Sequence, residues 1–306
     1  MKNKLMRVGV IGMGSMGKNH ARILSRISSF ELVGFWDPHS PPESLENSPK
    51  KFDSLQHLLD AHLDYCVVAS PTLTHVEIAC ELILRGTNIL VEKPLASTLQ
   101  GCKEIMATAE KTSVKVGVGH IERFNPAIQI AKDVINANNF GDQLFIDTYR
   151  KGPTPNRNLG VGVAIDLMSH DIDTTLWLTG SSYIAINSLS SDSLVKDNEQ
   201  LSVLQAKLKN GAIVRHQVDW ITPKKIRQIR ISFANAFLEI DSLNNKVELT
   251  RHINGKSTTE IFVTGPSALE PLELEHLEFK KFVLGEESQI ADLQQATRVI
   301  EVLSKI

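Results

Sequence analysis

Asp166 and His170 lie four positions apart in a segment that is expected to be helical, Asp166-Leu-Met-Ser-His170-Asp-Ile-Asp173. Residues at this spacing share one face of a helix, about 6 Å apart along its axis. An imidazole beside a carboxylate suits a general base, because a hydroxyl that loses its proton while its carbon gives up hydride needs a base near neutral pH. The pair alone is not specific, since such pairs are more often surface contacts or capping groups.

Cationic side chains stand near the predicted ends of strands. Lys93 ends an apolar run and precedes Pro94, and a cation there can orient a substrate hydroxyl or stabilise an alkoxide. Guanidinium groups match phosphate in a bidentate fashion, so the cations at the start of the second half could grip a phosphate-bearing substrate. They are Arg123, Arg150, Lys151 and Arg157, with His120, Asn125 and Tyr149 as weaker candidates. Solvated surface charge is the alternative for each cation.

Six residues near the N-terminus have the pattern of a phosphate-binding turn: Gly12, Met13, Gly14, Ser15, Met16 and Gly17. They follow an apolar run at residues 8–11 and precede a helix-like segment. Glycines allow a tight turn, a close approach of the backbone to a pyrophosphate, and close packing of helix on strand. The helix N-terminus then faces the phosphates. A bland strand-to-helix connection is the alternative reading of this pattern.

Asp37 ends the next apolar run and follows Gly17 by 20 residues. This is the spacing at which a dinucleotide-binding fold places an acid against the adenosine ribose hydroxyls. A carboxylate there also repels a 2′-phosphate, and residues 38–42 contain no Arg or Lys to offset it. The sequence therefore favours NAD over NADP, with a solvated strand-end cap as the alternative role of Asp37.

Strand-like and helix-like segments alternate from Arg7 to Gly119, which predicts a doubly wound parallel sheet. Ligands of such sheets bind beyond the carboxyl ends of the strands. Several candidate residues fall at such ends and could meet in one cleft: Gly12, Asp37, Ser70, Lys93 and His120. We therefore assign residues 1–121 to an NAD-binding Rossmann domain.

Beyond His120 the alternation ends, and most segments between about 183 and 263 look like strands separated by Asn-Gly or Asn-Asn turns. Residues 122–306 are predicted to form an α+β domain for substrate binding and oligomerisation, built on an open, mostly antiparallel mixed sheet flanked by helices. The C-terminal segment is helical, with an apolar face that can pack back on the first domain.

Composition limits the function classes. The 306 residues are 42% hydrophobic and carry a net charge of −2 with both signs interspersed, which disfavours a nucleic-acid partner. No apolar run approaches a membrane span or a signal peptide, so a cytoplasmic protein is expected. The three cysteines are widely spaced and lack a CxxC pattern, which argues against disulfides and a zinc site. No metal is expected.

Taken together, these motifs resemble the glucose-fructose oxidoreductase / inositol dehydrogenase (Gfo/Idh/MocA) family along essentially the whole chain. The resemblance implies a bound NAD, a homodimer or homotetramer that often uses the C-terminal sheet, and a catalytic pair formed by Lys93 and His170, with Asp166 helping to hold substrate. The cofactor residues that it implies are Gly12, Met13, Gly14, Ser15, Met16, Gly17, Asp37, Ser70, Pro71, Thr72, His75, Glu92 and Lys93.

Within the family, residues 119–126 and 163–173 are most similar to those of nucleotide-sugar 3-dehydrogenases, particularly enzymes that act on UDP-N-acetylglucosamine. The substrate-binding residues implied are Lys93, Arg123, Asn125, Tyr149, Arg157, Asp166 and His170. Two alternatives stay open: an inositol or free-sugar dehydrogenase of the same family, and a non-enzymatic NAD-binding regulator. Intact Lys93 and His170 argue against the regulator.

Overall fold

A computed structural model describes residues 5–39, 49–155, 161–191, 199–265 and 269–306. Contacts within the chain divide it into two compact units. The first comprises residues 1–121 and 269–300, and the second comprises residues 122–268 and 301–306. The segment at residues 269–300 therefore returns to complete the unit that the N-terminus begins.

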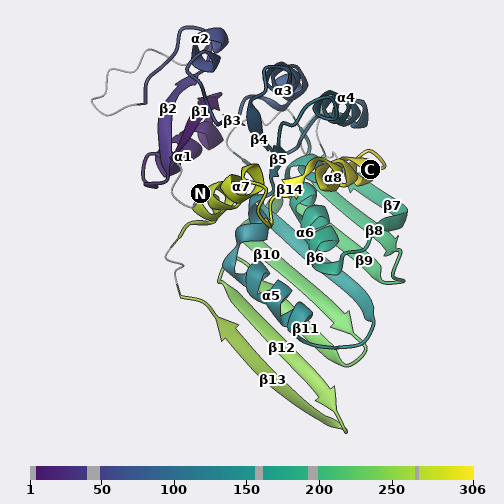
Figure 1. Ribbon diagram of the computed structural model, residues 1–306. Coiled ribbons are helices and arrows are strands. Elements are labelled where there is room, and N and C mark those ends of the chain that lie inside the picture. The colour runs from purple at the N-terminus through teal and green to yellow at the C-terminus, as the bar shows by residue number, and fades with distance from the viewer. Residues whose placement is uncertain (1–4, 40–48, 156–160, 192–198, 266–268) are drawn as a thin grey trace. The chain divides into compact units, whose positions relative to one another are not determined.

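The first unit is built on a sheet with the strand order β14-β5-β4-β3-β1-β2 (Figure 1). All neighbours are parallel except β14, which pairs antiparallel with β5. The strands are β1 (Met6–Ile11), β2 (Phe30–Trp36), β3 (Tyr65–Val68), β4 (Asn88–Glu92), β5 (Val116–Gly119) and β14 (Ala291–Asp292). Every residue of β3 is buried, as expected for a central strand covered on both faces. This confirms the predicted Rossmann-type parallel sheet.

Helices connect these parallel strands, since a parallel pair needs a long crossover. They are α1 (Ser15–Leu24), α2 (Leu55–Leu59), the short 3-10 helix η1 (Thr72–Thr74), α3 (His75–Leu84) and α4 (Leu99–Ala109). Two further helices, α7 (Pro271–Val283) and α8 (Leu293–Leu303), precede and follow the antiparallel strand β14. Although α7 comes from the far end of the sequence, it packs against α1 (Figure 1). This contact brings residues about 250 positions apart into one buried cluster.

The second unit is a mixed sheet with the strand order β13-β12-β11-β10-β6-β9-β8-β7. Among the described strands of this second sheet, only the β6–β9 pair is parallel, which confirms the mostly antiparallel prediction. The strands are β6 (Gln143–Pro153), β7 (Tyr183–Ser191), β8 (Leu201–Leu208), β9 (Ile213–Asp219), β10 (Ile221–Phe233), β11 (Ala236–Asp241), β12 (Lys246–Ile253) and β13 (Lys256–Val263).

Helices cover one face of this second sheet. Helix α5 (Pro126–Ala137) packs on β11 and β12, and helix α6 (Ser169–Thr179) packs on β6. The 3-10 helix η2 (Ile121–Phe124) precedes α5, and the π-helical turn η3 (Ala164–Met168) precedes α6. Successive side chains of a strand point to opposite faces. On β6, Arg150 therefore points toward α6, where it meets Asp171, while Tyr149 points to the open face.

Within the described ranges, no helix has the length and apolar character needed to cross a membrane.

Candidate functional site

The glycine turn forms a cradle that larger side chains would fill. Gly12 has φ +86°, and a Cβ added to it would lie 2.6 Å from the backbone nitrogen of Ser70. A Cβ on Gly17 would lie 1.9 Å from the carbonyl oxygen of Gly12. A Cβ on Gly14, by contrast, meets no described atom within 4 Å. The first glycine thus allows the turn, the third allows helix α1 to approach it, and the second leaves its outer side open.

The open side of this cradle is the start of helix α1. Gly14 is the N-cap and Ser15 the first helical residue, and both are exposed, whereas Met13 is buried and Met16 half-buried. Backbone N–H groups of the first helical turn lack partners within the helix and attract anions. The donor set and the space beside Gly14 fit the pyrophosphate of a dinucleotide.

Asp37 lies beside the turn and not out in solvent. One carboxylate oxygen accepts a hydrogen bond from the Met13 N–H at 2.7 Å, and the other accepts one from the His39 N–H at 2.8 Å. The acid at the end of β2 is therefore fixed against the glycine turn, as a ribose-binding acid needs to be.

Two loops follow β3 and β4 at the same edge of the sheet, and His75 links them. Its two ring nitrogens lie 2.9 Å from the Ser70 carbonyl oxygen and 3.0 Å from the Pro94 carbonyl oxygen. Burial lowers the pKa of His75, and this outweighs the opposing effect of the carbonyl contacts. Pro71, which is exposed, caps η1, and Thr72 begins it. Each predicted cofactor residue after Asp37 therefore lies at the carboxyl edge of the sheet.

Glu92 and Lys93 end β4 at this edge. The Lys93 N–H donates to one Glu92 carboxylate oxygen at 3.1 Å, and His20 lies 2.9 Å from the other. Burial raises the pKa of Glu92, but the His20 hydrogen bond and the charge of Lys93 outweigh it and hold the pKa below its ordinary value. The peptide bond between Lys93 and Pro94 is cis.

In the second unit, Asp166 lies in the π-helical turn η3, and His170 is the second residue of α6. Both side chains are half-buried. The sequence pattern predicted an ordinary helix here, and it did not distinguish the π turn that carries Asp166. Single π turns occur often at functional sites.

Glu199 fixes the start of this helix. Its carboxylate accepts a hydrogen bond from the Ala164 N–H at 3.0 Å, and its carbonyl accepts one from the Val163 N–H at 3.1 Å. A Cβ on Gly162 would lie 1.8 Å from a Glu199 carboxylate oxygen. Gly162 is therefore needed for the close approach of Glu199, a positioning residue that the sequence analysis missed.

Two buried ion pairs anchor the next turn of α6. Arg123 donates two hydrogen bonds to the Asp173 carboxylate, at 2.9 and 2.6 Å. Arg150 donates to Asp171 at 2.9 Å and to Glu122 at 3.0 Å. Arg123 thus has a structural partner, and its predicted contact with substrate stays a prediction.

The other predicted substrate residues lie apart from one another. Asn125 caps helix α5 by accepting the Ala127 N–H, and its side-chain amide donates to the Ser242 carbonyl. Tyr149 lies on the open face of the sheet, opposite α6, where its hydroxyl donates to Asp147 at 2.7 Å. The structure therefore does not bring Tyr149 together with Asp166 and His170. Arg157 lies outside the described residues.

Arg227 is a further cation on the helix-facing side that the sequence analysis did not single out. It is paired with Arg150 in the register of β10 and β6. Burial and the Arg150 cation lower the pKa of Arg227, against the carboxylates of Asp171, Glu122 and Asp166. Two cations side by side, with acids around them, could have been recognised only once the strand register was known.

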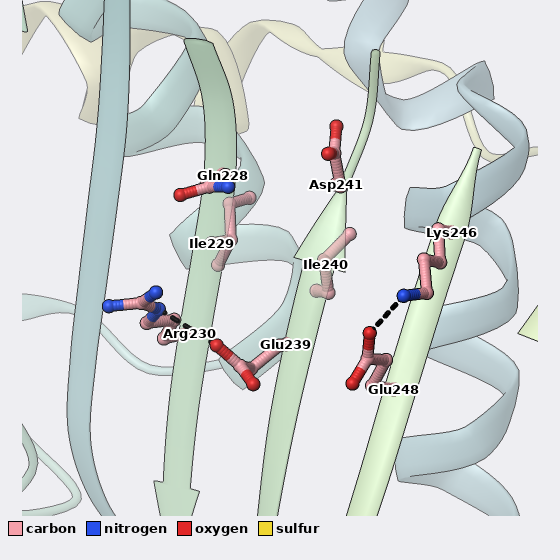
Figure 2. A pocket seen from close by; sticks show the side chains of 8 residues that line it. All are labelled: Gln228, Ile229, Arg230, Glu239, Ile240, Asp241, Lys246 and Glu248. Carbon is pink, nitrogen blue, oxygen red and sulfur yellow. Dashed lines mark ion pairs between the residues drawn. The ribbon is translucent and has the colours of Figure 1, made fainter. Parts of the chain in front are cut away.

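A depression on the open face of β10, β11 and β12 is a different kind of surface (Figure 2). Its charged side chains are largely paired with each other, Arg230 with Glu239 at 3.0 Å and Lys246 with Glu248. It lies on the face away from α6, because Arg230 shares its side of the sheet with Tyr149. No group of three or more His, Cys, Asp or Glu within the described ranges could hold a metal ion.

The glycine cradle, the acid fixed beside it and the parallel sheet together define a dinucleotide-binding protein with a second sheet domain. Residues 6–120 match the family model for the oxidoreductase family with an NAD-binding Rossmann fold, and residues 128–239 match the GFO/IDH/MocA C-terminal domain. The chain belongs to the GFO/IDH/MocA oxidoreductase family. It is an NAD-dependent oxidoreductase.

Three relatives illustrate the likeness. The UDP-N-acetylglucosamine 3-dehydrogenase of Acidithiobacillus ferrooxidans is 29% identical over 247 residues, 80% of this chain and 76% of the relative. A crystal form of that enzyme superposes with a TM-score of 0.85 at 24% identity, covering 98% of this chain and 96% of the other. The WlbA dehydrogenase of Bordetella pertussis, in complex with NADH and UDP-GlcNAcA, has a TM-score of 0.84 at 19% identity, covering 99% and 95%. Inositol 2-dehydrogenase 4 of Saccharopolyspora erythraea is 31% identical over 61% of this chain and 58% of its own length.

Proposed function

We propose that this chain oxidises a secondary alcohol of a sugar to a ketone, and that its substrate is a UDP-linked N-acetylhexosamine oxidised at C3. The observation that carries the proposal is the match with the UDP-N-acetylglucosamine 3-dehydrogenase, which extends over 80% of this chain and so includes parts of both units. Inositol and free-sugar dehydrogenases of the family are the second candidate class, supported by the match with an inositol 2-dehydrogenase over 61% of this chain.

The proposed roles follow from the chemistry of each side chain. His170 accepts the proton of the sugar hydroxyl, because an imidazole is a base near neutral pH. Asp166, one helical turn before it, accepts a hydrogen bond from the substrate. Lys93 polarises the reacting oxygen with its ammonium group. NAD supplies the hydride acceptor.

Glu199 supports the role of His170 because it fixes the start of the helical segment that carries this histidine. The glutamate bonds the N–H groups of Val163 and Ala164, and the ion pairs of Asp171 and Asp173 fix the following turn. A base held on a rigid helix loses little free energy to orientation in the transition state. Arg157, and to a lesser extent Arg123 and Asn125, are proposed to contact the nucleotide-sugar, whereas Tyr149, on the opposite face of the sheet, is not.

The test is a screen for NADH formation across UDP-sugars, inositols and free sugars. We expect turnover with a UDP-N-acetylhexosamine and competitive inhibition by UDP. Turnover of inositols or free sugars, with no inhibition by UDP, would establish the second class instead. NAD⁺ binding without turnover of any tested alcohol would favour the non-enzymatic regulator.

Variants then test the roles. Lys93→Ala and His170→Ala should each lower kcat by a factor of about 10² to 10⁴, the range of general acid–base and electrostatic contributions. The controls are Lys103→Ala and His252→Ala, since both side chains are exposed and neither is proposed to touch substrate or cofactor. Near wild-type rates in both Lys93→Ala and His170→Ala would refute the assignment.

We also propose that the chain forms a homodimer or homotetramer through the open face of its second sheet, which sedimentation velocity would measure. A groove on that face is lined by apolar and cationic side chains, including Phe145, Ile213 and Arg215, and such a face can be covered by a second copy.

A further inference from the structure

Three buried side chains of the first unit and the partly buried Glu92 form one continuous hydrogen-bond chain that ends at Glu92. Tyr65 Oη lies 2.9 Å from His276 Nδ1, His276 Nε2 lies 3.0 Å from His20 Nδ1, and His20 Nε2 lies 2.9 Å from Glu92 Oε1. Tyr65, His20 and His276 are each at most 1% exposed. The residues come from four elements, β3, α7, α1 and β4, so only the folded unit assembles them.

The chemistry of the two ends fixes the direction of every bond. An ionised carboxylate only accepts, so the proton of His20 Nε2 points to Glu92. At the other end, the buried phenol of Tyr65 has His276 Nδ1 as its partner among the described residues. A phenol that did not donate to this nitrogen would leave its O–H buried without an acceptor, which costs free energy. His276 therefore accepts from Tyr65 at Nδ1 and donates from Nε2 to His20 Nδ1.

The electrostatics agree with this direction. Burial raises the pKa of Tyr65 and keeps it a donor. Burial lowers the pKa of His276 and keeps it neutral, with a single N–H. The same cluster contains Glu275, one residue before His276, whose pKa is raised well above its ordinary value by burial and by the charge of Glu92.

The two carboxyl groups of the cluster are therefore in different states. Glu275 is fully buried, and neither of its oxygens has a hydrogen-bond partner in the described part of the chain, so it is a neutral acid. Glu92, whose pKa lies below its ordinary value, is ionised, and its two oxygens accept from His20 and from the Lys93 N–H. The charge beside Lys93 thus depends on His20.

We propose that Tyr65, His276 and His20 are positioning residues that hold Glu92 ionised and oriented beside Lys93. The inference rests on the role proposed for Lys93. These three side chains do not touch substrate. They act through Glu92, whose carboxylate accepts the Lys93 backbone N–H and provides the negative charge next to the Lys93 ammonium group.

The first experiment measures the ionisation of Glu92 without any substrate. Carboxyl ¹³C shifts of labelled glutamate, with Glu92 assigned by Glu92→Gln, are followed against pH in the full-length protein. We expect Glu92 to titrate below its ordinary value of 4.5 in the wild type and above it in His20→Leu, which leaves the buried carboxylate without its imidazole donor. His20→Gln keeps a donor and an acceptor and should restore the low titration.

The second experiment measures the direction of the hydrogen bonds between Tyr65, His276 and His20. In protein labelled with ¹⁵N-histidine, we expect the single proton of His276 on Nε2, and in Tyr65→Phe we expect the fixed preference for this tautomer to weaken. Tyr183→Phe is the matched control, because it also removes a phenol from a histidine, in this case the half-buried Tyr183 hydroxyl at 2.7 Å from His216 Nε2 in the second unit. It should cost similar stability and leave the Glu92 titration unchanged.

Kinetics connect both measurements to Lys93, with whichever alcohol is oxidised. In His20→Leu, kcat relative to the wild type should fall more at about pH 6 than at about pH 9, by about tenfold for each unit by which the new pKa of Glu92 exceeds 6. The Kd for NAD⁺ should stay within a factor of about two. A Glu92 titration that His20→Leu does not move, a His276 proton on Nδ1, or an equal loss of kcat at both pH values would each overturn the proposal. Failure of every alcohol in the screen would refute the proposed function, while the two NMR measurements would still decide the direction of the chain and the state of Glu92.

Discussion

Replacing Gly17 with alanine places a methyl group where the structure has backbone. The added Cβ would lie 1.9 Å from the Gly12 carbonyl oxygen and 2.9 Å from its carbon. An ordinary contact begins near 3.4 Å, so helix α1 and the turn would have to separate by about 1.5 Å. No flexible side chain can yield, since both close atoms belong to the main chain.

The magnitude follows from two opposing terms. Overpacking costs about 1–3 kcal/mol, and a main-chain neighbour places this site at the upper end. Alanine within a helix recovers about 1 kcal/mol relative to glycine. We expect a net loss of about 2 kcal/mol, which lowers the Tm by about 4–8 °C at roughly 2–4 °C per kcal/mol for a protein of this size class.

The assay compares thermal unfolding with and without NAD⁺. At 100 times its Kd, a ligand that binds only the folded state adds about 2.7 kcal/mol, so the wild-type Tm should rise by about 5–10 °C. Gly14→Ala is the informative partner, because its Cβ meets no described atom within 4 Å. Its Tm without NAD⁺ should stay at the wild-type value, and its rise with NAD⁺ should fall to about half if the Kd weakens tenfold.

Gly152→Ala controls for the general effect of the substitution, since its Cβ would make only an ordinary contact, 3.7 Å from Lys225 Cγ. If Gly17→Ala unfolds at the wild-type Tm, the close packing of α1 on the turn is not required. If Gly14→Ala retains the full rise with NAD⁺, the pyrophosphate does not approach the turn at Gly14.

Further predictions concern selectivity, packing and pH. Asp37→Ser should raise the ratio of kcat/KM for NADP⁺ to that for NAD⁺, measured with the same alcohol; a ratio that stays constant would contradict the ribose contact proposed for Asp37. Arg123→Met should destabilise the second unit by about 3–5 kcal/mol in urea unfolding, because it leaves Asp173 buried without its partner, and the double variant with Asp173→Leu should recover most of that loss. Burial lowers the pKa of His216 from 6.5 to about 3. The unfolded state therefore binds a proton that the folded state does not, and stability that is complete above about pH 6.5 should be lost by about 1.4 kcal/mol per pH unit toward pH 3; His216→Asn should flatten this decline, and an unchanged slope would assign it to other groups.

The fold could be predicted because its evidence is local. The apolar runs at residues 8–11 and 65–69, the glycine turn between strand and helix, and the regular alternation up to Gly119 depend on neighbours in sequence. The antiparallel character of the second sheet followed from its turns in the same way. The return of α7 to the first unit depends on contacts across about 250 residues, and no local pattern encodes its partner.

The same distinction applies to individual site residues: those whose role depends on local sequence could be predicted, and those whose role depends on distant contacts could not. Asp37 was predicted from its spacing, and the structure fixes it against Met13. Arg123, also predicted from its type, is held by Asp173, whose proximity arises from the packing of α6. Strand parity already separates Tyr149 from Arg150 in the sequence, but it cannot say which of the two faces a helix will cover. Glu199, Arg227 and His276 were missed because their partners come from other elements.

Three aspartates closely follow Val163, namely Asp166, Asp171 and Asp173, and residue type alone could not show which of them is available to bind substrate. Asp171 and Asp173 are each 1% exposed and bonded to buried arginines, whereas Asp166, in the π turn, is half-buried. A carboxylate that forms a buried ion pair with an arginine cannot turn to a substrate hydroxyl without breaking that ion pair. Asp166 is the most exposed of the three, which is why the proposal assigns it to substrate, and the ion pairs of the other two fix the helix on which His170 stands.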